Sequence, residues 1–175
     1  MPKNSRRRRS PGVRRTAAPS LAALMEQPFK GVLAQARALA RTDDALEVEQ
    51  FASELASMAW DMPLIDGDFE ALFGQALVHF AQRRGGPEGV ALLLAVAAVQ
   101  AEWAPQAGAA ARQLMALGVP APPWAETLAR PRFSEAWLGV EPFGDQDLLI
   151  LAFQYEGHAR HAMQVLVDNN LDGVA

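Results

Sequence analysis

The chain contains no cysteine among its 175 residues. This absence excludes disulfide bonds and zinc sites built on thiolates, and it is compatible with a reducing compartment. The sequence also has no apolar run that approaches the roughly 18 to 20 residues of a membrane-spanning helix. We therefore expect a cytoplasmic protein that neither relies on disulfides nor enters a membrane.

The common motifs of catalytic and nucleotide-binding sites are missing as well. There is no Gly-x-Ser-x-Gly nucleophile elbow. The turn Gly85-Gly86-Pro87 lacks both the lysine and the preceding strand of a phosphate-binding loop. From these patterns we predict no catalytic residue, no cofactor and no resident metal, and we favour a protein that is not an enzyme.

Acidic residues are absent from the first fifteen positions, where positive charge is concentrated. Seven basic residues lie there, and the other 160 residues hold nine basic and all twenty acidic residues, so an arm of charge +7 precedes a body of charge −11. A block of like charge repels itself and stays solvated, which predicts a disordered arm over residues 1–19. Arginine pairs well with phosphate, and the candidate nucleic-acid contacts are Arg6, Arg7, Arg8, Arg9, Arg14 and Arg15.

Three interpretations of the arm stay open: a tail without a partner that folds back on the acidic body, a contact to nucleic acid, and a contact to an acidic protein or membrane surface. The arm has no aromatic side chain on which a base could stack, and no helix of the acidic body shows a basic face in the sequence. A secretory leader is disfavoured, because Pro19 and Ser20 precede a short apolar run that Glu26 ends.

The sequence from residue 20 to 118 predicts a helical bundle. Apolar residues spaced three and four apart predict amphipathic helices at about 28–41, 44–60 and 69–84, with Asp43 or Asp44 capping the second. The unbroken apolar run from 90 to 99 predicts a helix buried on all sides at the centre of the bundle. A further helix begins near residue 105 and ends before Gly118.

The pattern changes after a proline-rich connector with a short helix, residues 119–133. Apolar runs at 148–153 and 163–167 flank Glu156-Gly157-His158 and predict a β-hairpin, with a third strand ahead of it at 135–140. We thus predict an α+β fold, in which antiparallel strands within residues 134–175 pack on the bundle. Strands this apolar need both faces covered and their edges protected. This predicts either a protein partner or self-association at the sheet edge, or a chain that is a fragment of something longer.

Histidines and acidic residues near the C-terminus are the remaining candidates for chemistry. His158, His161 and Asp168 are the candidate residues of a hydrolytic or metal-dependent enzyme. A spacing of three along a strand points two side chains to opposite faces, so we favour histidines exposed at a turn. Residues 168–173 match the first half of a calcium loop, but the glutamate that such a loop needs would fall beyond residue 175. Asp145 and Asp147 are accounted for by a turn.

Trp124 follows two prolines. We expect its side chain to be partly exposed, with a contact to a partner as the alternative to a structural role. Trp60 and Trp103 end predicted helices, where an indole seals a core and its N–H reaches a partner.

Several short stretches carry a resemblance. They are residues 49–55, Pro122-Pro123-Trp124, residues 144–147 and residues 161–171. Through them the chain resembles, from Asp44 onward, an uncharacterised family of proteins from GC-rich bacteria, and the excess of arginine over lysine fits such a source. The resemblance implies no activity and no catalytic residue. Members often begin with a short basic tail and extend further than this chain, so the resemblance favours the fragment interpretation.

These observations favour a non-catalytic interaction domain with a basic arm. The first alternative is a nucleic-acid-associated protein that contacts phosphates through the arm. The second is a hydrolase or metal-dependent enzyme that uses His158, His161 and Asp168.

Overall fold

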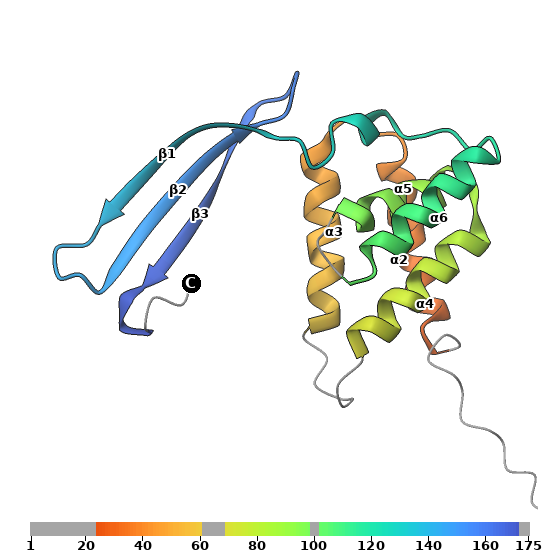
Figure 1. The fold of residues 1–175 in the computed structure, drawn as a ribbon, viewed down its shortest axis with the longest axis horizontal. Coiled ribbons are helices and arrows are strands. Elements are labelled where there is room, and N and C mark those ends of the chain that lie inside the picture. Colours follow the sequence, from red (N-terminus) through yellow and green to blue (C-terminus); the bar gives the residue numbers. More distant parts are fainter. Residues whose placement is uncertain (1–23, 61–68, 99–101, 172–175) are drawn as a thin grey trace, which may run out of the picture.

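The computed structural model describes residues 24–60, 69–98 and 102–171. Within them, five helices pack together and a three-stranded antiparallel sheet follows, which confirms the predicted α+β fold (Figure 1). The arginine-rich arm and the predicted turn at Asp66-Gly67-Asp68 lie outside the described residues.

The first two helices of the bundle begin as their sequences predict. α2 (Glu26–Leu39) carries Pro28 in its first turn, where a missing backbone N–H breaks no helical hydrogen bond. α3 (Ala45–Trp60) is capped by Asp44, whose Oδ1 accepts a hydrogen bond of 2.9 Å from the Leu46 N–H. Both helices turn apolar stripes toward the interior of the bundle.

The most apolar helix lies at the centre, as predicted. α5 (Gly86–Ala98) packs against α2, α3, α4 (Phe69–Arg84) and α6 (Ala104–Ala116), so it is surrounded by the other helices. Two glycines with positive φ, Gly85 at 63° and Gly86 at 72°, allow the sharp turn from α4 into α5. α6 ends before Gly118, whose φ is 94° and whose position matches the predicted C-terminal glycine.

The buried side chains form two clusters. The larger one fills the bundle and includes a group of aromatic rings, in which Phe29 lies 5.5 Å from Phe73 and 5.6 Å from Phe80 between ring centroids. The smaller one joins α2, α3 and α5 to Trp124, which lies in the short helix η1 (Pro123–Glu126), and to Tyr155, which follows the second strand. The second cluster therefore anchors the connector and the sheet to the bundle.

The sheet is a meander of β1 (Arg132–Val140), β2 (Gln146–Gln154) and β3 (Arg160–Asp168). β2 is the central strand, with Ile150 opposite Trp137 on one side and Gln164 on the other. The predicted hairpin turn is present: Gly157 has a φ of 79°, and the His158 N–H donates to the Tyr155 carbonyl at 3.1 Å. A bulge at Ser134 shifts the register between β1 and β2.

We expected the strands to pack on the bundle. In the structure the sheet is instead attached at one end and projects away from the helices (Figure 1). Of the residues in the three strands, Ala152 alone is fully buried. The physical reason lies in the helices: their apolar stripes converge on α5, and the side of α3 nearest the sheet carries Leu46 but otherwise the polar residues Glu49, Gln50 and Ser53. The bundle therefore offers the strands little apolar surface beyond their attached end.

Candidate protein-interaction surface

Alternation along the strands and their register divide the side chains of the sheet between two faces. We call inner the face whose residues Phe153, His161 and Met163 line a hollow together with α3. Its members are Phe133, Ala136, Leu138, Val140, Asp147, Leu149, Leu151, Phe153, His161, Met163, Val165 and Val167. The outer face includes Glu135, Trp137, Gly139, Leu148, Ile150, Ala152, Arg160, Ala162, Gln164 and Leu166.

The inner face is apolar over nearly its whole length. It contains no lysine or arginine, one carboxylate at the far end of the sheet (Asp147) and one imidazole at the attached end (His161). Large side chains on both outer strands are exposed: Leu138 by 63 % and Met163 by 51 %. Such a surface is typical of a sheet that packs against a second layer, but the described residues supply no such layer.

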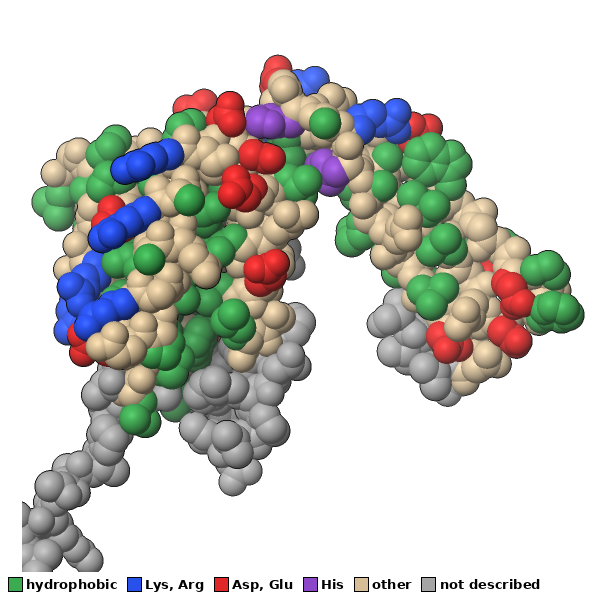
Figure 2. Space-filling view, turned by 180° about the vertical axis from the view of Figure 1, so that it is seen from behind, with side chains coloured by type: hydrophobic (Ala, Val, Ile, Leu, Met, Phe, Trp, Pro, Cys, Tyr) green, Lys and Arg blue, Asp and Glu red, His purple; other side chains and the backbone are tan. Residues whose placement is uncertain are grey.

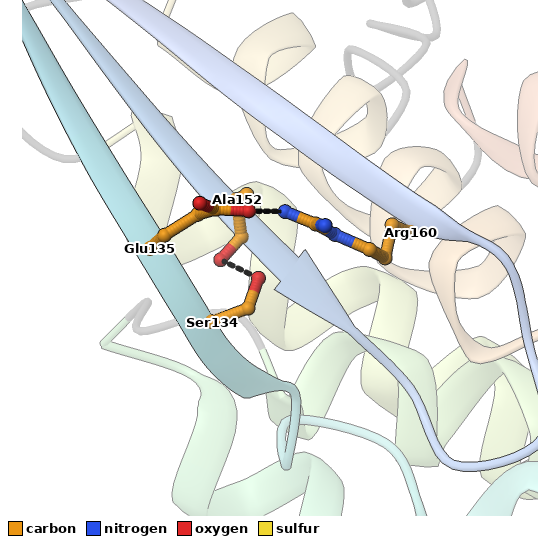
Figure 3. A network of polar contacts seen from close by, with 4 residues as sticks. All are labelled: Ser134, Glu135, Ala152 and Arg160. Carbon is orange, nitrogen blue, oxygen red and sulfur yellow. Dashed lines mark hydrogen bonds and ion pairs between the residues drawn. The ribbon is translucent and has the colours of Figure 1, made fainter.

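The outer face changes character along its length. Near the bundle, Glu135 and Arg160 form an ion pair across Ala152, and the Ser134 hydroxyl donates to the Ala152 carbonyl at 3.1 Å (Figure 3). Toward the far end, Trp137 and Leu166 flank the aliphatic side chains of β2 and are both about half exposed. The middle of the sheet is therefore apolar on both faces, and polar residues (Gln146 and Asp168) return at the far end of the outer face.

The space-filling view shows how apolar and acidic side chains are distributed over the sheet (Figure 2). Hydrophobic side chains run along the projecting sheet, and acidic side chains gather near its far end. A continuous apolar run such as residues 148–153 is typical of a strand covered on both faces. Contiguous exposed apolar area of this kind marks interaction surfaces.

A hollow of about 440 Å³ lies where the sheet meets α3. Its walls are Leu46, Glu49, Gln50, Ser53, Pro131, Phe153, His161, Ala162 and Met163. The His161 ring stacks on Phe153 at 6.0 Å and on Tyr155 at 5.8 Å between ring centroids. His161 therefore helps to pack the attached end of the sheet.

The structure does not bring the candidate catalytic residues together. His158 lies in the turn between β2 and β3, and His161 and Asp168 lie seven residues apart on β3, a separation of about 23 Å at the rise of a strand. Among the residues that the structure describes, no three histidine, aspartate or glutamate side chains are arranged to hold a metal ion.

Asp147 and Asp168 lie in the strands at the far end of the sheet, where hydrogen bonds tie them to the residues that follow β3. The Asp168 carboxylate accepts a hydrogen bond of 2.9 Å from the Asn170 N–H, and the Asn169 side chain donates to Asp147 at 3.4 Å. The last two residues of the calcium-loop match, Asp172 and Gly173, lie outside the described residues.

The burial of Trp124 differs from what the sequence predicts. The side chain that we expected to be partly exposed is fully buried, and its indole N–H donates a hydrogen bond of 2.6 Å to the carbonyl of Leu39, the last residue of α2. This N–H satisfies one of the backbone acceptors that a helix leaves unpaired at its C-terminus. Trp124 is thus a structural anchor and offers no contact to a partner.

Sequence reasoning missed a basic surface that two helices form together. Lys30 and Arg37 on α2 and Arg84 at the end of α4 line a hollow of about 340 Å³. Glu26 and Glu88 pair with these cations at 3.1 to 3.8 Å, and hydrogen bonding and attraction to Lys30 hold the pKa of Glu26 below its ordinary value. Basic side chains are visible along the bundle on the side away from the sheet (Figure 2). The seven-residue spacing of Lys30 and Arg37 was the available signal, but α4 completes the surface only in the fold.

Tyr155 gives a spectroscopic test of how firmly the sheet is anchored. It is the only tyrosine of the chain, and burial, together with the neighbouring Glu49 carboxylate, raises the pKa of its phenol well above the ordinary value of 10.0. Above pH 10 the unfolded state therefore releases the phenolic proton while the folded state still holds it. The stability that Tyr155 contributes is thus present below pH 10 and falls as the pH rises further. In an ultraviolet titration, we expect phenolate absorbance at about pH 10 in concentrated urea and only at higher pH in the native protein. The same midpoint in both states would contradict the burial of Tyr155.

None of the described helices is long and apolar enough to cross a lipid bilayer. Comparison with protein-family models, with curated proteins and with solved structures found no match to this chain. The resemblance to an uncharacterised bacterial family therefore stays a prediction.

Proposed function

We propose that the protein is a non-catalytic interaction domain whose projecting sheet docks on a protein partner. The observation that carries this proposal is the exposure of Trp137 and Leu166 on one face of the sheet and of Leu138 and Met163 on the other. Burying such side chains provides the main driving force of protein association.

The architecture supports this role in two further ways. The bundle has its own complete core, so it serves as a rigid base to which Trp124 and Tyr155 fix the sheet. Within the described part of the chain, no further strand pairs with β1 or β3, so their outer edges can pair with another chain.

A charge on the sheet tests the proposal. High salt weakens contacts between charges but not apolar contacts. We therefore expect Leu138→Lys to abolish retention of a partner at high salt, because it places a charge in an apolar contact. Leu117→Lys is the matched control, since Leu117 is 82 % exposed at the end of α6, away from the sheet. The readout is affinity capture with each purified variant followed by mass spectrometry. Equal retention by both variants, or a monodisperse monomer that retains nothing, would contradict the proposal.

A second candidate function is association with nucleic acid through the arginine arm. The basic surface of α2 and α4 favours it, because α2 begins close to the arm in the chain and the three cations of this surface outnumber the two carboxylates that pair with them. The arm and the surface would both neutralise phosphates and release counterions.

This candidate predicts a steep dependence of binding on salt. Deleting residues 1–15, or combining Arg37→Glu with Arg84→Glu, is expected to weaken binding to a short duplex. The slope of log K against log salt should fall by about 0.9 for each phosphate that is no longer neutralised. Arg130→Glu, an exposed change in the connector, is the control. Gel shifts at two salt concentrations measure the effect, and binding that neither change affects would remove this candidate.

A further inference from the structure

We propose that the hollow between β3 and α3 receives an extended segment of another protein, which adds to the free edge of β3 as a fourth, antiparallel strand. The bound segment carries apolar side chains and at least one lysine or arginine. The inference rests on the proposed interaction function, and it names the edge, the mode of binding and the chemistry of the partner.

The hollow is bounded by the edge of β3 as well as by the inner face of the sheet. His161, Ala162 and Met163 line it together, although the side chains of consecutive strand residues point to opposite faces. A space that reaches the edge of the strand touches all three. One face of α3 forms the opposite wall, with residues at positions i, i+3, i+4 and i+7: Leu46, Glu49, Gln50 and Ser53.

The backbone of β3 offers free hydrogen-bonding groups to this hollow. Opposed residues of an antiparallel pair alternate between hydrogen-bonded and non-hydrogen-bonded pairs. The Asn169 N–H donates to the Asp145 carbonyl at 2.9 Å, just beyond the last pair of β2 and β3. Counted back from Asn169, the odd-numbered residues of β3 bond to β2. Ala162 and Gln164 therefore turn their N–H and C=O groups away from β2, and Ala162 does so at the hollow.

The edge of β3 is open to pairing, whereas the edge of β1 is protected. β1 carries a bulge at Ser134 and the charged Glu135 beside it, and both features disfavour pairing at an edge. Between Arg160 and Asp168, a stretch that the structure describes in full, β3 has no proline, glycine, lysine or register shift. Strand addition uses main-chain hydrogen bonds at such an edge, and pockets beside it select the side chains.

The charges along β3 favour a basic segment. Glu49 is the one carboxylate among the described residues that line the hollow, and none of them is a lysine or an arginine. Arg160 is already paired with Glu135, and acidic side chains gather near the far end of the sheet (Figure 2). A lysine or arginine near Glu49, with apolar side chains against Phe153 and Met163, therefore complements the walls.

Selection from a displayed library of random linear peptides, with the full chain as bait, supplies the probe. We expect enrichment of apolar residues together with a lysine or arginine. A selected peptide is then synthesised with methyl groups on alternate backbone nitrogens. Methylation of the set that faces β3 should weaken binding about tenfold or more, whereas methylation of the intervening set should leave the affinity unchanged.

Variants of the chain test the same hydrogen bonds from the other side. Ala162→Pro removes an N–H that faces the hollow, and proline is tolerated where a strand turns this group away from its sheet. We expect about tenfold weaker binding of the selected peptide. Ala136→Pro, the equivalent change at the free edge of β1, is the matched control and should bind as the unmodified chain does. The methylated peptides decide the question if Ala162→Pro does not fold.

Glu49→Gln tests the charge separately. The glutamine keeps an oxygen for the Ala129 N–H, which Glu49 accepts at 3.0 Å, but it loses the negative charge. We expect the unmodified chain to prefer the selected peptide over a version with glutamine in place of its basic residue. Glu49→Gln should bind the two versions equally.

No enriched peptide, or a peptide that binds Ala162→Pro as tightly as the unmodified chain, would overturn strand addition at β3. A peptide that binds only after residues 1–15 are deleted would show that the chain's own arm occupies the hollow, and would overturn a separate partner. The proposed interaction function survives either result if Leu138→Lys still releases a retained protein. It fails as well if Leu138→Lys changes nothing.

Discussion

Replacing Trp124 with alanine is expected to lower the free energy of unfolding by about 3 to 5 kcal/mol, the range for a large aromatic side chain removed from a core. The indole is completely buried among residues of α2, α3 and α5, and its N–H pairs with the Leu39 carbonyl at 2.6 Å. The change removes apolar contact and the hydrogen-bond donor together. It also removes one of the two aromatic anchors of the sheet, so we expect partner binding to weaken with stability.

Two further variants separate the contributions. Trp124→Phe keeps most of the ring but leaves the Leu39 carbonyl without its donor, which costs about 1 to 3 kcal/mol. Trp137→Ala removes an indole that is 47 % exposed on the sheet, and we expect a destabilisation below about 1 kcal/mol. Urea unfolding followed by circular dichroism measures all three. If Trp124→Ala unfolds as late as Trp137→Ala, then Trp124 is not the anchor that the structure shows.

Gly74→Ala is expected to destabilise the bundle by about 1 to 3 kcal/mol, because an added methyl group would meet the indole ring of Trp103 directly. Trp103 is buried and also packs edge-on against Phe73, with ring centroids 6.3 Å apart, so it cannot move aside freely. The close approach of α4 to this ring thus depends on a residue without a side chain.

Gly31→Ala is the matched control and should have the opposite sign. Gly31 also lies in a helix, but no atom of a described residue outside that helix's own backbone lies within 4 Å of the position that its Cβ would take. Alanine there gains about 0.5 to 1 kcal/mol from the lower conformational entropy of the unfolded chain and from its higher helix propensity. Thermal unfolding of the two variants side by side is the measurement. A shift of both midpoints in the same direction would show that contact with Trp103 does not limit residue 74.

Short sequence patterns predicted those features of the fold that residues close together in the chain determine. The apolar run of α5 predicted a central helix, Asp44 predicted a cap, and Gly157 predicted the turn of the hairpin, because each depends on neighbours in the chain. The burial of Trp124 was not predictable in this way, since its partner Leu39 lies 85 residues earlier.

The sites depend on the tertiary arrangement to an even greater degree. The apolar sequences of the strands predicted that a second layer packs on them. Whether the helices form that layer depends on where their apolar stripes point after packing. Likewise, the basic surface exists only because α2 and the end of α4 lie together. The hairpin also decides where the two histidines lie, because His158 falls in its turn and His161 on β3.

The attachment of the sheet at one end makes it a lever. A strand of nine residues is about 30 Å long, so a rotation of about 10° at the attached end displaces the far end by about 5 Å. The rings of Trp124 and Tyr155 hold that end in the core. A small rotation about these two aromatic side chains would thus displace the far end of the sheet by about the width of a side chain.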